Sequence, residues 1–447
     1  MLGEVEAHRV CQQILSQCEC QAAEVLVLSE DLALTRFARN AIQNDETEQS
    51  VNLILRVMIG KRIGTASSSR LDDESLLLAL GRAWTNAQTS PEEAEYLPLP
   101  EPVQYTPVEA FDPVTADNSP EQRAETVEEI CALAENKALT ASGVLATGSE
   151  EVAVVNSEGL RAYYASTKAN FETIVTGEDS SGRTHAAAWR LEDLPVKALG
   201  IEAVENAGRG HKPKLVDAGE YTVVAGPHAT EDMLQMLNYH GINAQDVYEG
   251  RSWMNDLIGE RAMDEKVSIW DDGLDPLGLP MPFDFEGVPK QRVEIVQNGV
   301  VMGPVYDRQI AARLGKSATG HAMPPTFRGM GALAGNLFMA GGEASLEEMI
   351  HSTERGLYVT GFWYTHLMSP RGCLVTGMTR DGAFMIEKGK ITHPVKNLCF
   401  TQSYVEALRN VEMIGKERRL MASEFGGITL CVPALKIRQF NFTGPAE

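Results

Sequence analysis

The chain has 447 residues, a length typical of two or three domains, which excludes a small disulfide-stapled module. Lys and Arg number 39 against 62 Asp and Glu, and the resulting formal net charge of −23 is spread along the sequence. Such a surface repels phosphate backbones, so we expect no binding of nucleic acid.

Neither a membrane span nor an export signal is expected. The longest apolar stretches, 51–59 and 332–339, are far shorter than the ~20 residues that cross a bilayer. The N-terminal region is acidic and lacks an apolar segment flanked by basic residues, which a signal peptide requires. The seven cysteines include no C-x-x-C pair and are typical of reduced, mostly packed thiols. These features predict a cytoplasmic protein.

The first half of the chain predicts helices and antiparallel strands. Apolar residues at helical spacing indicate helices, and alternating apolar residues indicate strands joined by a short turn. The apolar stripe of the second helix comprises Leu76, Leu77, Leu80, Ala83, Trp84 and Ala87. In chain order, the expected elements are a helix over 5–17, an apolar segment over 24–28, a strand over 51–59, its turn 60–62 and partner 63–66, and a helix from Asp72 to Ser90.

A second group of elements follows the proline-rich segment 98–113, which predicts an extended linker. Ser119 is the expected N-cap of the next helix, with Pro120 at its first position and Gln122 completing a capping box. Val127, Ile130, Cys131 and Ala134 form the expected buried face of this helix. The short strands that follow are expected at 152–155, 160–165 and 171–176.

The Gly- and Pro-containing segment 208–213 predicts a domain boundary. We expect an N-terminal α+β domain over 1–213, with subdomains at about 1–97 and 114–213 on either side of the linker. The remaining residues, 214–447, are expected to form a β-rich C-terminal domain. The predicted fold class is therefore α+β.

In the second half, segments 266–289 and 315–342 are rich in Gly and Pro and predict long loops, the second of them a flexible rim. Ser345 is the expected N-cap of a helix over 346–354. A hairpin is expected over 383–392, and a closing pair of strands over 428–442.

Two short groups of residues allow a metal site. None of the nine histidines is followed by Glu, so the chain contains neither H-E-x-x-H nor H-E-x-x-x-H. His228 and Glu231 share one face of a predicted helix, with His240 on its opposite side. The plain alternative, a helix N-terminus with a solvated Glu, is favoured. The second group is Glu347, Glu348, His351 and Glu354, for which an ordinary charged helix surface is favoured.

Other catalytic motifs are weaker. The glycines at 329–331 and 335 lack the spacing of a phosphate-binding loop, and no G-x-S-x-G is present. Cys373 is conceivable as a nucleophile, but a packed thiol is favoured. The aromatic, Gly and Thr residues over 356–365 and 375–382 suit an extended-peptide cleft, whereas their periodicity alone favours an ordinary β core.

Several short segments are characteristic in combination: 37–42, 56–64, 335–338, 347–350, 356–360, 386–389, 433–437 and 442–444. Together they resemble the TldD/PmbA family, also called modulators of DNA gyrase. The resemblance runs from end to end, and it implies two branches that pair as a heterodimeric peptidase. In the metal-bearing branch an H-E-x-x-x-H helix and a C-terminal Cys-Gly-Lys loop supply the ligands. Here the corresponding stretches, 228–234 and 424–427, lack them, and Cys431 falls inside the following strand. The chain thus resembles the PmbA (TldE) branch.

The resemblance implies a metal-free subunit that holds unfolded peptides and closes the chamber, with zinc on a TldD-like partner. It identifies no confident catalytic residue and no metal ligand or cofactor on this chain. The alternatives are a self-sufficient hydrolase that uses His228 and Glu231 or Glu347 and His351, and a non-enzymatic regulator of gyrase or another protein. A homodimer is also left open. The expected substrate contacts are Thr360, Gly361, Trp363, Tyr364, Thr379 and Arg380.

Overall fold

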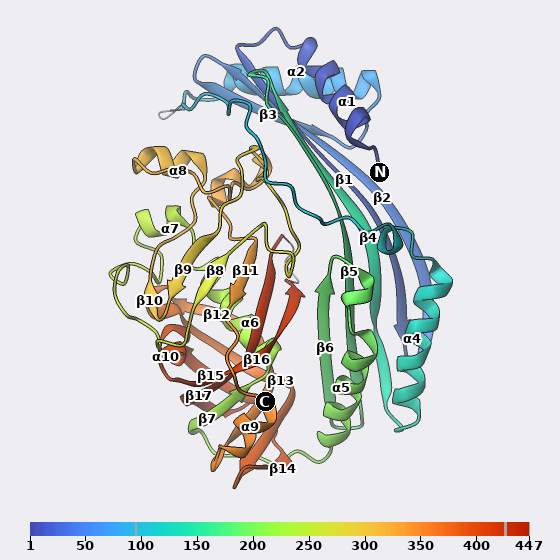
Figure 1. Cartoon of the computed structure of the whole chain (residues 1–447), viewed down its shortest axis with the longest axis vertical. Coiled ribbons are helices and arrows are strands. Elements are labelled where there is room, and N and C mark those ends of the chain that lie inside the picture. The colour runs from blue at the N-terminus through green and yellow to red at the C-terminus, as the bar shows by residue number, and fades with distance from the viewer. Residues whose placement is uncertain (94–95, 424–426, 447) are drawn as a thin grey trace.

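The computed structural model describes residues 1–93, 96–423 and 427–446 and consists of two sheets with flanking helices (Figure 1). The first sheet has six antiparallel strands in the order β3-β2-β1-β4-β5-β6. This arrangement confirms the α+β class with antiparallel pairing. Its strands are β1 (Ala22–Ala38), β2 (Ala41–Ile59), β3 (Arg62–Ser68), β4 (Thr140–Asn156), β5 (Arg161–Thr176) and β6 (Ser181–Ala188).

Helices cover one face of this sheet. Ser119 and Gln122 form the predicted capping box of α4, and the predicted face of that helix is buried. In α2, however, Leu77 is 52% exposed, so its predicted place in the apolar stripe is wrong. Among the described residues, no helix is long and apolar enough to cross a membrane. The helices are α1 (Glu4–Ser16), α2 (Asp73–Thr89), α3 (Pro113–Ala116), α4 (Pro120–Glu135), η1 (Leu191–Asp193) and α5 (Val196–Arg209).

The strands of this sheet are longer than predicted. The two strands expected at 160–165 and 171–176 are one strand, β5, and 152–155 is the end of β4. Polar residues between the apolar runs of β5 remain in the sheet because β4 pairs with β5 along its whole length. Apolar periodicity within a short window therefore underestimated the lengths of β4 and β5.

The proline-rich segment 98–113 is extended, and it packs against the rest of the molecule. The Tyr105 hydroxyl donates a 2.7 Å hydrogen bond to the carbonyl of Gly287, and its ring packs against Phe283. Ala110 is buried in the same cluster, which covers the face of the first sheet opposite its helices. The segment therefore helps to hold the two halves of the chain together.

The second sheet contains β7 to β17 and is mixed, because β12 runs parallel to β7 and β11 runs parallel to β17. Three expectations are wrong here. The segments 266–289 and 315–342, expected to be loops, contain the strands β8 and β11, which are too short to show an alternating pattern. The closing pair of strands expected over 428–442 is the single strand β17. The strands are β7 (Gly219–Ala225), β8 (Ile269–Asp271), β9 (Val293–Gln297), β10 (Val300–Val301), β11 (Asn336–Met339), β12 (Arg355–Ser369), β13 (Leu374–Glu387), β14 (Lys390–Pro394), β15 (Leu398–Ser403), β16 (Val411–Ala422) and β17 (Thr429–Pro445).

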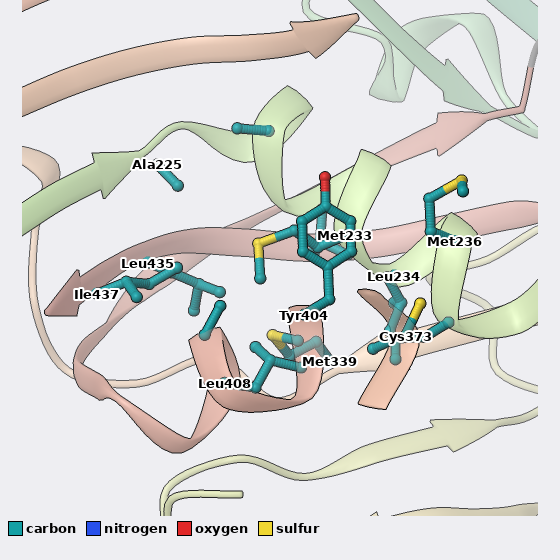
Figure 2. Packing of buried hydrophobic residues seen from close by; sticks show 14 of the residues in the cluster. Ala225, Met233, Leu234, Met236, Met339, Cys373, Tyr404, Leu408, Leu435 and Ile437 are labelled. Atoms are coloured by element: carbon teal, nitrogen blue, oxygen red, sulfur yellow. The ribbon is translucent and has the colours of Figure 1, made fainter. Parts of the chain in front are cut away.

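The core of this half packs around α6, as Figure 2 shows for Met233 and Leu234 beside Tyr404 of α10 and Cys373. Burying α6 in this way fixes the position of its first turn. The capping box predicted at Ser345 is present, although α9 ends at His351. The helices are α6 (Pro227–Tyr239), α7 (Ala244–Tyr248), α8 (Arg308–Arg313), η2 (Pro325–Met330), α9 (Leu346–His351), η3 (Arg371–Cys373) and α10 (Tyr404–Arg409).

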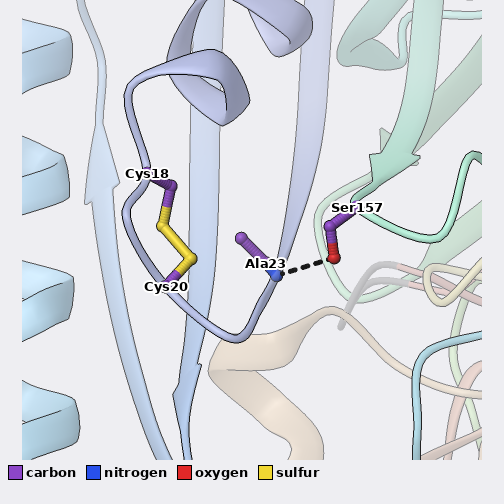
Figure 3. The surroundings of a disulfide bond; sticks show 4 residues. All are labelled: Cys18, Cys20, Ala23 and Ser157. Atoms are coloured by element: carbon purple, nitrogen blue, oxygen red, sulfur yellow. Dashed lines mark hydrogen bonds between the residues drawn. A yellow bond between two sulfur atoms is a disulfide. The ribbon is translucent and has the colours of Figure 1, made fainter.

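Cys18 and Cys20 form a disulfide in the turn between α1 and β1 (Figure 3). The expectation that all seven cysteines are reduced is therefore wrong for this pair. Their Cα atoms lie 5.2 Å apart, within the range that a disulfide spans. The other five cysteines are free, and all of them except Cys399 are buried.

A buried ion cluster joins the two halves. The Arg56 guanidinium of β2 lies 2.9 Å from the Glu24 carboxylate and 3.1 Å from that of Glu286, which belongs to the second half. The three side chains are only 4%, 1% and 8% exposed. Removing one charge from such a cluster leaves the opposite charges buried, which is costly.

We predict that Arg56→Met lowers the free energy of unfolding by about 3–5 kcal/mol, because two buried carboxylates lose their guanidinium. Arg70→Met is the matched control, since Arg70 pairs with Asp72 at 76% side-chain exposure and should cost less than about 1 kcal/mol. Urea denaturation of both variants measures the difference. Equal losses would contradict an essential role for the buried cluster.

Asp284 lies beside this cluster and accepts backbone hydrogen bonds from Glu286, Val288 and Ala322. Burial, reinforced by the nearby Glu286 carboxylate, raises the pKa of Asp284 to about 7. A carboxyl with a raised pKa binds its proton more tightly in the folded state. Its contribution to stability is therefore present at low pH and is lost as pH rises through about 7.

We predict that Asp284→Asn reduces the loss of unfolding free energy between pH 5 and pH 8 by about 2 kcal/mol relative to the wild type. The quantity compared is the change in unfolding free energy with pH, so an overall loss of stability in the variant does not affect the comparison. Asp275→Asn, which alters a turn carboxylate on the same loop, should keep the wild-type pH dependence. Parallel slopes for wild type and Asp284→Asn would contradict the prediction.

Candidate functional site

The turn between β7 and α6 places two polar side chains against β12. The Gly226 amide donates a 2.8 Å hydrogen bond to the Val359 carbonyl, and a Cβ at Gly226 would lie 3.3 Å from the carbonyl oxygen of Thr360. Glycine therefore allows the turn to approach the strand closely. Pro227 then begins α6, so that His228 lies in its first turn and Glu231 follows three residues later on the same face.

A third residue, His185 of β6, completes a cluster with these two. His185 Nε2 lies 2.9 Å from Oε2 of Glu231, and the rings of His185 and His228 stack with centroids 4.4 Å apart. The His228 Nδ1 atom lies 3.9 Å from the same carboxylate. The three side chains are about nine-tenths buried. The cluster thus joins the first sheet to the first turn of α6.

Arg419 of β16 contacts the opposite edge of His228. Its Nη1 donates to His228 Nε2 at 3.2 Å, and its Nη2 pairs with Glu202 of α5 at 2.6 Å. A guanidinium only donates hydrogen bonds, so Nε2 accepts and the neutral ring carries its proton on Nδ1. The Nδ1 atoms of His185 and His228 have no hydrogen-bond partner.

The electrostatics of the cluster favour a neutral His228 beside an ionised Glu231. Burial, together with the adjacent His185, lowers the pKa of His228 to about 3. Burial opposes ionisation of Glu231, but His185 and His228 outweigh this effect and lower the pKa of the carboxyl to about 2. A neutral imidazole and a carboxylate are the forms that bind metal ions.

The next residue, Asp232, belongs to a separate buried network. Its Oδ2 accepts hydrogen bonds from the hydroxyls of Tyr404 at 2.5 Å and Thr365 at 3.1 Å. Burial raises the pKa of Asp232 to about 6 despite these donors. The network ties α6 to both β12 and α10, which holds the cluster in place.

The cluster lines a cleft with a cavity volume of about 290 Å³. One side of the cleft is β12, which pairs with β7 over Gly356–Val359 and continues beyond the end of β7. Within the described residues, no strand pairs with that edge of β12 past Val359. The lining residues include Arg183, His185, His228, Glu231, Asp232, Thr360, Gly361, Phe362, Trp363, Tyr364, Thr365, His366, Arg380 and Asp381.

Five of the six expected substrate contacts line this cleft, and Thr379 does not. The Thr379 hydroxyl is fully buried and accepts a hydrogen bond from the Leu398 amide, which gives it a structural role. Whether the other five contact a peptide stays a prediction. They are Thr360, Gly361, Trp363, Tyr364 and Arg380.

The second candidate metal group is not assembled. Glu348 is engaged in the capping box of α9, accepting from the amide and hydroxyl of Ser345. Among the described residues, only His185, His228 and Glu231 form a group of three with metal-binding geometry. Cys373 is buried, and burial raises the pKa of its thiol to about 12, as expected for a packed thiol.

His185 was not predicted as a site residue from the sequence. It stands on a strand 46 positions from Glu231 and carries no local motif. His185 reaches α6 because β6 pairs with β5 and because the two sheets dock against each other. Neither arrangement can be predicted from residue spacing. Only the shared helix face of His228 and Glu231 could be found from the sequence.

The donor set fits a metal ion. The three ligand atoms lie within 4.8 Å of one another, and two His with one carboxylate are a known ligand set of catalytic zinc. The Nδ1 atom of His228 faces the carboxylate, and it would bind an ion only after its proton moves to Nε2, the atom that Arg419 contacts. This group weighs against the expectation that the chain carries no metal. The Arg419 cation, which lies 3.2 Å from His228, opposes binding of a positively charged metal ion.

A strand-lined cleft with a His–His–Glu cluster in its wall is a site typical of a metallopeptidase. Sequence comparison gives the same class: the pattern of the PmbA/TldA metallopeptidase C-terminal domain matches residues 218–444, and that of the central domain matches 114–210. The first match alone covers more than half of the chain. The chain therefore belongs to the TldD/PmbA metallopeptidase family.

Individual relatives are distant. A metalloprotease of Methanothermobacter thermautotrophicus is 26% identical over 277 residues, and the match spans 60% of each chain. TldE from Thermococcus kodakarensis superposes with a TM-score of 0.86 at 22% identity, covering 99% of this chain and 100% of that chain. A candidate modulator of a DNA gyrase from Thermotoga maritima gives 0.85 at 19% identity, covering 98% and 100%. These structures establish the likeness of fold.

We predict that Arg419→Met tightens binding of Co²⁺ to the purified chain about tenfold, because it removes a cation next to His228. Arg418→Met, the neighbouring position on β16, is the matched control and should leave the affinity unchanged. Titration followed by Co²⁺ absorption measures both. Equal affinities in Arg419→Met and wild type would show that the guanidinium does not oppose the metal.

Proposed function

We propose that this chain takes part in peptide hydrolysis: it binds an extended peptide along the free edge of β12, and His185, His228 and Glu231 hold a divalent metal ion, zinc by their chemistry. One observation carries the proposal. The unpaired edge of β12 and the His–His–Glu cluster line the same cleft. The chain matches metalloprotease relatives over 50–60% of their length.

The free edge of β12 supports peptide binding in particular. An extended peptide can add to a strand edge through main-chain hydrogen bonds, while alternate side chains enter pockets. Gly361 presents no side chain there, and its Cβ position would lie 3.6 Å from the Cβ of His228. A peptide on this edge therefore passes directly beside the cluster.

The residues of the cluster and their neighbours have different roles in this proposal. A bound divalent ion would polarise a scissile carbonyl or lower the pKa of a bound water. Glu231 would supply negative charge to balance such an ion, and the burial of His185 and His228 would keep bulk water away from it. The hydroxyls of Tyr404 and Thr365 hold Asp232 and so keep the first turn of α6 in position.

A second candidate is the metal-free subunit of a heterodimeric TldD/TldE-type peptidase that degrades or matures unfolded peptides. It is favoured by the contact of Arg419 with His228 and by the lack of an H-E-x-x-x-H sequence. In that case the cleft would hold the peptide while a TldD-like partner supplied the zinc. The cytoplasmic location expected from the sequence suits either candidate.

The deciding measurement is the metal-to-protein ratio of the purified chain, by elemental mass spectrometry after loosely bound ions are removed. We expect a ratio near one in the wild type and near zero in His185→Phe and Glu231→Gln. His211→Phe, which changes an exposed histidine paired with Asp179, is the control and should keep the wild-type ratio.

Hydrolysis of an unfolded peptide is measured in parallel, by the chain alone and with a TldD-like protein added. Activity of the chain alone that is lost with Glu231→Gln supports the metal-holding role. A ratio near zero, with hydrolysis only after the TldD-like protein is added, would favour the metal-free subunit instead. No hydrolysis under either condition would overturn both candidates.

A further inference from the structure

Two guanidinium groups flank a single indole ring at the cleft. The Arg380 Cζ atom lies 4.6 Å from the centroid of the Trp363 ring, and that of Arg183 lies 5.9 Å from it. All three residues line the cleft. Stacking on an aromatic face holds a guanidinium in one orientation while leaving its N–H edge available for hydrogen bonds.

The two arginines differ in their partners. Arg183 Nε pairs with the Glu172 carboxylate at 2.7 Å, so its charge is balanced within the fold. Arg380 is exposed, and no acidic side chain of the described residues pairs with it. The neighbouring carboxylate, Asp381, accepts instead from the hydroxyl of Ser181 at 2.7 Å. Arg380 therefore presents an unbalanced positive charge to the cleft.

The position of Arg380 is set by the sheet. It lies opposite Gly361 in the pairing of β12 with β13, and the Cβ position of Gly361 would lie 3.8 Å from the Arg380 carbonyl and 3.6 Å from His228. Arg380 belongs to β13, on the side of β12 opposite the free edge, but its side chain lines the same cleft as the cluster, so a peptide held in the cleft can reach this guanidinium. Because the chain carries −23 overall, a negatively charged peptide needs such a local cation to bind.

We propose that Arg380, oriented by Trp363, is a specificity-determining residue that binds a carboxylate of the peptide; this inference rests on the proposed peptide-binding function of the cleft. A planar guanidinium pairs with a carboxylate through two parallel hydrogen bonds. The carboxylate comes either from the C-terminus of the peptide or from an Asp or Glu side chain. Both sources present the same chemistry to Arg380.

The test uses the full chain and four fluorescein-labelled hexapeptides of one sequence. They combine a free or amidated C-terminus with Glu or Gln at one internal position. Binding is read by fluorescence anisotropy at 0.15 M salt with a chelator present, so that no turnover interferes. The proteins are wild type, Arg380→Gln, Arg380→Lys and Arg313→Gln. Arg313 lies over Tyr248 away from the cleft, so its loss changes the net charge equally.

In the wild type we expect a peptide with the preferred carboxylate to bind about tenfold tighter than its neutral counterpart. Arg380→Gln should bring that ratio to about one, Arg380→Lys should keep part of it because the charge without the planar fork remains, and Arg313→Gln should keep it in full. The pair of peptides that shows the effect identifies the source as C-terminal or side-chain carboxylate. Since Arg380 is exposed, unchanged thermal unfolding of the variants shows that they fold.

Two outcomes overturn the inference, and they are distinguishable. Binding of all four peptides with equal affinity by wild type and Arg380→Gln would remove the carboxylate preference and leave peptide binding intact. Failure of every peptide to bind the wild type would overturn both this inference and the proposed function.

Discussion

The buried carboxylate of Glu231 is the interaction on which the cleft depends. It accepts from His185 of the first sheet and lies beside His228 of its own helix, so that one charge joins the two halves of the chain. A buried carboxylate without such neighbours would be strongly disfavoured. The docking of β6 against α6 therefore determines whether the site exists at all.

Much of the local structure could be predicted from the sequence, because capping and turn chemistry act over a few residues. The capping boxes at Ser119 and Ser345 and the hairpin at Lys388 are present where their residues indicate. Strand length was harder to predict. The continuous β5 and the short β8 in a Gly-rich stretch owe their conformation to neighbouring strands, and pairing of that kind leaves little trace in local periodicity.

The candidate site was predictable only where its residues are close in sequence. His228 and Glu231 share a helix face, which spacing reveals, and the Gly- and Thr-containing part of β12 indicated a cleft. His185 and Arg419 reach His228 from strands in different sheets, so no spacing pointed to either of them. These two residues change what the pair could do chemically: with His185 it becomes a group of three that could hold a metal ion, whereas Arg419 places a cation beside His228.

The two sheets share more than this cluster around the cleft. Glu202 of α5 pairs with Arg419 of β16, and Ser181 of β6 donates to Asp381 of β13. Each contact engages a residue next to a group that faces the cleft, namely His228 in one case and Arg380 in the other. A shift of the first sheet would therefore disturb both of these contacts together. The cation near His228 is balanced by a carboxylate of the other half, so the charge around this imidazole depends on how the two halves dock.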